Sequence, residues 1–127
     1  MSKSLRKDLE NVLAELEQRV GDIEGSAIVR NDGLIIAFAM PKGVDESLVA
    51  AMSAALVSIG TRTVRELVRG DLEKVIVSAA MGDLVLMGAG PDTVLSVTTR
   101  SSSNLGLVLV SMKRTISRIG QLISGGS

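Results

Sequence analysis

Three arginines near the end of a predicted helix are the side chains in this sequence best suited to contact phosphate. Arg62, Arg65 and Arg69 recur at intervals of three and four residues, so they share one side of the helix. A guanidinium presented in this way can contact the transferring phosphate of a nucleotide held by a partner protein. The same spacing also suits cations that complement the negative end of the helix dipole. The residues alone leave both interpretations open.

The remaining residue types argue against catalysis. The chain has no cysteine and no histidine, which excludes disulfides, thiol nucleophiles and imidazole acid–base chemistry. Residues 87–93 are glycine-rich but lack the Gly-Lys-Ser/Thr ending of a phosphate loop, so they predict a hairpin turn. Asp32, Asp83 and Asp92 fall in predicted turns without the spacing of a calcium loop. We therefore expect no enzyme, no catalytic residues, no metal and no cofactor.

Composition favours a protein that associates with other protein chains. The 127 residues carry 14 basic and 14 acidic side chains, and this balance gives no general attraction to nucleic acid or to anionic membranes. The mean hydropathy of +0.37 is high for one small domain and favours self-association. The apolar run at 34–40 is much shorter than a membrane span, and no signal segment is evident. We expect a cytoplasmic protein without membrane insertion.

Hydrophobic periodicity predicts eight elements in the order α-β-β-α-β-β-β-α. Helices are expected at about 5–20, 45–69 and 105–123, where apolar residues recur at helical spacing. Strands are expected at 26–30, 34–40, 74–79, 84–89 and 94–99, with Asn31-Asp32-Gly33 turning the first hairpin. This order predicts an α+β fold with a five-stranded antiparallel sheet. The chain is expected to form a single domain at 1–124 with a flexible tail at 125–127.

The middle helix departs from the usual amphipathic pattern. From Leu48 to Ile59 it has no charged side chain, so it lacks the polar face expected of a helix that covers one side of a sheet. Its small residues permit close approach of a second backbone. We expect cover on both sides, most simply from a second copy in an isologous contact. The alternative is that the first or third helix covers it within the same chain.

Three segments carry a resemblance to a known family. The hairpin Val29–Ala37, the strand segment Gly82–Leu86 and the segment Ser103–Arg114, in this order around the small-residue helix, resemble the Roadblock/LC7 domain. The resemblance covers about residues 5–123. It implies a profilin-like three-layer fold with helices on both faces of the sheet. It also implies a homodimer, or a heterodimer with another Roadblock-type chain, in which middle helices pair and third strands join into one continuous sheet.

The resemblance also implies partners. Members of this family bind small Ras-like GTPases as activators of hydrolysis or as scaffolds, whereas others are adaptors on dynein motors. The expected function is therefore a protein-binding module that regulates or scaffolds a small Ras-like GTPase; the alternative is a purely structural dimerisation or adaptor module. The expected dimer-interface residues are Ala50, Ala54, Val57, Thr61, Val64, Lys74, Val75, Ile76 and Val77. The expected partner-binding residues are Ala51, Ala55, Ser58, Arg62 and Arg65.

Overall fold

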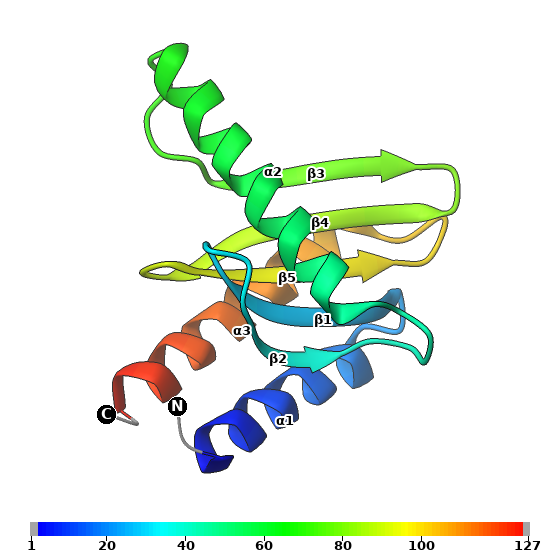
Figure 1. Ribbon diagram of the computed structural model, residues 1–127. Helices are drawn as coiled ribbons and strands as arrows, with labels where there is room; N and C mark the ends of the chain where they lie inside the picture. The colour runs from blue at the N-terminus through cyan, green and yellow to red at the C-terminus, as the bar shows by residue number, and fades with distance from the viewer. Residues whose placement is uncertain (1–2, 126–127) are drawn as a thin grey trace.

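A computed structural model describes residues 3–125 of the chain and shows one sheet between two helical layers (Figure 1). The eight predicted elements are present in the predicted order. Their bounds are α1 (Lys3–Arg19), β1 (Ile23–Arg30), β2 (Ile35–Ala39), α2 (Glu46–Glu66), β3 (Lys74–Ala79), β4 (Gly82–Gly90), β5 (Thr93–Thr99) and α3 (Leu105–Gly125).

All neighbouring strands in the sheet are antiparallel, in the order β2-β1-β5-β4-β3. The centre of the sheet pairs β1 with β5, so that Ala27 lies opposite Ser96. The strands β2 and β3 form the two edges. Hairpins join β1 to β2, β3 to β4, and β4 to β5. Helix α2 connects the two edge strands, β2 and β3, across one face of the sheet. The expected α+β class and five-stranded antiparallel sheet are confirmed.

The two faces of the sheet bury different sets of side chains. On one face, α1 and α3 lie side by side and enclose the larger core, which includes Leu13, Ile28, Leu95 and Met112. On the other face, α2 alone covers a smaller core of five buried residues: Ala27, Val29, Ala50, Leu86 and Val94. Because successive strand residues point to opposite faces, β1 contributes Ile28 to the larger core and its two neighbours to the smaller one. This explains why the central strands lack polar alternation.

The structure corrects two predicted helix ends. The middle helix ends at Glu66 rather than Arg69, because Val68 takes a left-handed conformation with φ 52°. The amide of Arg69 then donates to the carbonyl of Val64 and closes the turn, which places Arg69 outside the helix. The last helix continues through Gly125, one residue into the predicted tail, and residues 126–127 lie outside the described part of the chain.

One glycine is required where β4 begins. Gly82 has φ 138°, and a Cβ atom added there would lie 2.0 Å from the carbonyl oxygen of Thr99. Gly88 lies in the same strand, and a Cβ at that position would meet nothing within 4 Å. Replacing each glycine by alanine therefore distinguishes two effects. Backbone strain and a steric clash arise only at Gly82, whereas the general effect of replacing a strand glycine arises at both positions.

We expect Gly82→Ala to lower the free energy of unfolding by more than about 2 kcal/mol, because it combines a disfavoured φ with a clash against backbone. Gly88→Ala should change stability by less than about 1 kcal/mol. Urea denaturation followed by circular dichroism measures both. Equal stability of the two variants would contradict the placement of Gly82 against Thr99.

A carboxylate links α1 to the sheet. The hydroxyl of Ser26 donates to Glu17 at 2.8 Å, and Ser26 itself is fully buried. Desolvation by burial raises the pKa of Glu17 above its ordinary value of 4.5, and the hydrogen bond from Ser26 offsets part of that rise. At pH values between the ordinary pKa of Glu17 and its raised pKa in the folded protein, the folded state therefore binds more protons than the unfolded state. Stability must fall as the pH rises through that interval.

We expect Glu17→Gln to raise the melting temperature at pH 7, because the amide oxygen still accepts from Ser26 without the desolvation of a charge. The variant should also lose the decline in stability as the pH rises from about 4.5 through the raised pKa. Thermal unfolding at several pH values tests this, with Glu10→Gln on the same helix as the control. A lower melting temperature of Glu17→Gln at pH 7 would contradict it.

Candidate protein-binding surface

Helix α2 is held on the sheet by its cap and by its small residues. The carboxylate of Asp45 accepts hydrogen bonds from the amides of Ser47 and Leu48, which satisfies the free donors at the helix start. One turn further on, Ala50 packs into the smaller core. Its small side chain lets the helix approach the sheet closely.

A buried pair of hydroxyls anchors the middle of the same helix. Ser53 donates to the hydroxyl of Ser96 on β5 at 3.3 Å, and both side chains are buried. Two turns further on, a Cβ at Gly60 would lie only 3.2 Å from side-chain atoms of Leu72 and Val75. The side of α2 that carries Ala50, Ser53 and Gly60 is therefore the side that contacts the sheet.

The opposite side of α2 exposes large apolar side chains. Leu48, Met52 and Ile59 have 55%, 49% and 64% of their surface exposed, and the small Ala55 lies between them. We call these four residues the apolar ridge. Their spacing of four, three and four residues is that of a helix seam that packs against another helix. Neither α1 nor α3 reaches this ridge, since both lie on the other face of the sheet (Figure 1). The alternative of cover within the chain is therefore wrong.

The structure corrects one predicted dimer residue. Ala50 is 1% exposed in the single chain and contacts the sheet, so a second chain cannot reach it. Ala54, Val57, Thr61 and Val64 are half-buried along the flank and underside of the helix. Of the apolar ridge, only Ala55 was among the predicted contact residues, whereas the three large side chains Leu48, Met52 and Ile59 were not. The signal that identifies it is the position of the small residues Ser53 and Gly60, which mark the side of closest approach to the sheet.

The predicted partner-binding residues lie together on the exposed side. Ala51, Ala55, Ser58, Arg62 and Arg65 are all solvent-exposed on α2, beside and within the apolar ridge. Within residues 3–125, neither the guanidinium of Arg62 nor that of Arg65 has a hydrogen-bond or ion-pair partner. Both guanidiniums are therefore available to another molecule.

The edge strand β3 adds a second unsatisfied surface next to the helix. It pairs with β4 along one edge, and no described strand pairs with the other. Lys74 and Val75 are half-buried, whereas Ile76 and Val77 are exposed. The last turns of α2 extend past this edge (Figure 1). An apolar, unpaired edge under an overhanging helix is a ready site for strand addition.

A hollow of about 210 Å³ lies where the overhang meets the sheet. It brings together four residues predicted to make contacts: Val57, Thr61, Arg65 and Lys74. Asp71 and Glu73, from the loop before β3, share its rim. No group of three or more acidic side chains among residues 3–125 is placed to hold a metal ion. The site is thus a mixed apolar and charged surface rather than a ligand cage.

The hydropathy of α2 is high along most of its length. Among residues 3–125 it is the one helix long and apolar enough, by length and composition, to cross a membrane, although serines, threonines and two arginines interrupt its apolar residues. Only 11% of its most apolar window is buried within the chain. Its cap and the Ser53–Ser96 hydrogen bond nevertheless place it as one layer of the domain.

Comparison with known proteins identifies the class. The family model for the Roadblock/LC7 domain matches residues 9–99. Two uncharacterised proteins of Methanocaldococcus jannaschii are each 38% identical over 111 residues, which cover 87% of this chain and 96% of each relative. These findings show that the chain belongs to the Roadblock/LC7 family.

Solved structures show the same fold. A Roadblock/LC7 domain from Streptomyces avermitilis superposes with a TM-score of 0.85 at 20% identity, covering 91% of this chain and 97% of that one. The gliding protein MglB from Thermus thermophilus gives 0.86 at 16% identity, covering 96% and 93%. The profilin of Acanthamoeba castellanii gives 0.65 at 13% identity, covering 89% and 98%. The predicted Roadblock/LC7-like, profilin-like architecture is confirmed.

The hydroxyl pair beneath α2 yields a direct test of how the helix is held. Ser53→Ala should lower the free energy of unfolding by about 1–3 kcal/mol, because the buried hydroxyl of Ser96 loses its partner. The double variant Ser53→Ala with Ser96→Ala should recover part of that loss, since no lone hydroxyl then remains. Chemical denaturation measures the cycle. Strictly additive losses would contradict a direct interaction between the two hydroxyls.

Proposed function

We propose that the protein is a non-enzymatic, dimeric module that binds and regulates or scaffolds a small Ras-like GTPase in the cytoplasm. The observation that carries the proposal is the apolar ridge, where three large side chains are about half exposed or more on one helix of a small domain. Contiguous exposed apolar surface of this kind marks an interaction site. The flanking Arg62 and Arg65 add cations suited to an acidic or phosphate-bearing partner.

Self-association follows from the overhang and the free edge. A second copy that added its own β3 antiparallel to this one would extend the sheet across the dimer. The overhanging turns of α2 would then lie over the partner's sheet, where Thr61 and Val64 could bury their remaining surface. One of the solved MglB structures is described as having a tetrameric arrangement, which supports self-association of this fold. A Roadblock-type chain of different sequence could occupy the same place.

In this dimer the apolar ridge stays on the side of α2 away from the sheet. Two copies would place two ridges close together and form a larger platform than one chain provides. The family resemblance assigns such a platform to a small Ras-like GTPase. The apolar side chains of α2 are covered by protein in this proposal, not by lipid, because the helix is already fastened to the sheet by Ser53 and Ala50.

The dimer is tested by solution mass. We expect the wild-type protein to have twice the 13.3 kDa mass of one chain in light scattering. Val64→Arg should shift it towards the single-chain mass, because it places a charge in the buried overlap. Gln121→Arg on α3 introduces the same side chain on the opposite layer and should leave the mass unchanged. A single-chain mass for the wild type would refute self-association.

The GTPase role is tested by capture of small Ras-like GTPases from the same genome, loaded with GDP or with a non-hydrolysable GTP analogue. We expect capture that depends on the nucleotide and is lost in Ile59→Arg, because the exposed Ile59 supports the contact and not the fold. The variant should keep the dimer mass. Absent or nucleotide-independent capture would instead favour the purely structural adaptor.

A further inference from the structure

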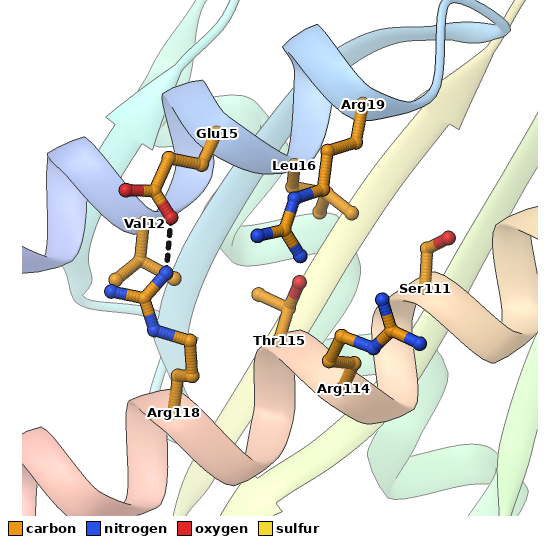
Figure 2. Close-up of a pocket in the computed structure, with 8 residues that line it drawn as sticks. All are labelled: Val12, Glu15, Leu16, Arg19, Ser111, Arg114, Thr115 and Arg118. Carbon is orange, nitrogen blue, oxygen red and sulfur yellow. Dashed lines mark hydrogen bonds and ion pairs between the residues drawn. The ribbon is translucent and has the colours of Figure 1, made fainter.

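A basic cleft lies between α1 and α3, on the layer opposite α2 (Figure 2). The two helices run antiparallel, with the start of α1 and the end of α3 at the same side of the molecule (Figure 1). This arrangement brings Arg19 at the end of α1 beside Arg114 in the middle of α3. Arg118, one turn further along α3, lines the other end of the cleft. Three guanidiniums therefore gather from two distant segments.

Most of this positive charge is not neutralised within the domain. Arg118 forms an ion pair with Glu15 across the cleft. The guanidiniums of Arg19 and Arg114 make no hydrogen bond or ion pair with any residue in 3–125. The helix α3 supplies no acidic residue at all to balance its cations. The cleft thus has a net excess of two positive charges, with both free guanidiniums exposed.

The hydroxyl of a largely buried threonine forms the floor between the arginines. Thr115 is only 7% exposed, and its hydroxyl points towards the guanidinium of Arg19 in Figure 2. This hydroxyl has no hydrogen-bond partner among residues 3–125, and since no fully buried side-chain oxygen there lacks a partner, it is open to the cleft. It is placed to donate to an oxyanion held by the guanidiniums, which are themselves suited to bind carboxylates. The Glu15–Arg118 pair shows that the cleft already accommodates one carboxylate.

Exposed apolar side chains continue the same face of α3. Leu107 and Val110 are 48% and 59% exposed. They precede Arg114 by seven and four residues, which places all three on one side of the helix. A free anion would use only the arginines and the hydroxyl. A surface that joins apolar side chains to unpaired cations instead complements a chain segment with both acidic and apolar residues.

We propose that the α1–α3 cleft docks an acidic, amphipathic segment of a partner protein, with a carboxylate held by Arg19, Arg114 and the hydroxyl of Thr115. The apolar residues of the partner segment pack on Leu107 and Val110. Glu15 competes with the incoming carboxylate for Arg118. This surface lies on the opposite side of the sheet from the apolar ridge, so the module can hold two partners at once.

The probe is a fluorescein-labelled peptide of about 12 residues with glutamate on one helical face and leucine on the other. Binding is measured by fluorescence anisotropy at low salt, where exposed ion pairs contribute most. The double variant Arg19→Gln with Arg114→Gln should weaken binding by about tenfold. Lys113→Gln removes a neighbouring cation outside the cleft and should change affinity by less than about twofold.

A variant of Glu15 provides the test in the opposite direction. Glu15→Gln should tighten peptide binding by about threefold, because it releases Arg118 from its internal carboxylate. A role of these residues in stability alone would not produce a gain of affinity. Before the affinities are compared, circular dichroism and solution mass must show that each variant keeps the fold and assembly of the wild type.

Four outcomes would overturn the proposal. They are equal binding by the double variant, equal binding of a peptide with glutamine in place of glutamate, weaker binding by Glu15→Gln, and displacement of the peptide by equimolar inorganic phosphate. Displacement by phosphate would show a site for free anions. None of these variants alters α2 or β3, so a failure here leaves the GTPase proposal standing, and the reverse also holds.

Discussion

The close packing of α2 on the sheet is the interaction on which the rest of this surface depends. Ala50 and Ser53 place the helix backbone near β1 and β5, and Gly60 does the same at β3. Because these small residues hold the helix close to the sheet, only the large side chains beside them, such as Leu56 and Val57, pack against the core. Leu48, Met52 and Ile59 are consequently directed to solvent. The fold therefore creates an apolar surface that a single chain leaves uncovered.

The two helical layers expose different kinds of surface because they pack differently. α1 and α3 share the larger core and shield each other's apolar stripes, so their outer faces are free to carry charge. Among the described residues, α2 has no helical neighbour, so its outer side is open to a second molecule. The overhang of α2 past β3 leaves a second open surface at the sheet edge (Figure 1). The proposed dimer covers the sheet edge and the overhanging turns, and the apolar ridge stays free for the GTPase.

The element order and the strands were predictable because apolar runs and turn residues mark them locally; the strand at 74–79 is predicted to the residue. The orientation of α2 was harder to predict. The segment Leu48–Ile59 has no charged side chain on any side, so the sequence does not show whether small residues such as Ala50 face the sheet or a partner. The basic cleft was missed for another reason: Arg19 and Arg114 are far apart in sequence. Only the antiparallel packing of α1 and α3 brings them together.

Hydrogen exchange at β3 tests most directly whether a second copy covers this edge. Within one chain, alternate amides of β3 donate to β4 and the others point outward. The account predicts that the outward-pointing amides are protected at high protein concentration and lose protection on dilution, because the partner's strand accepts their hydrogen bonds. Rapid exchange of these amides at every concentration, with β4 still protected, would contradict the dimer described here.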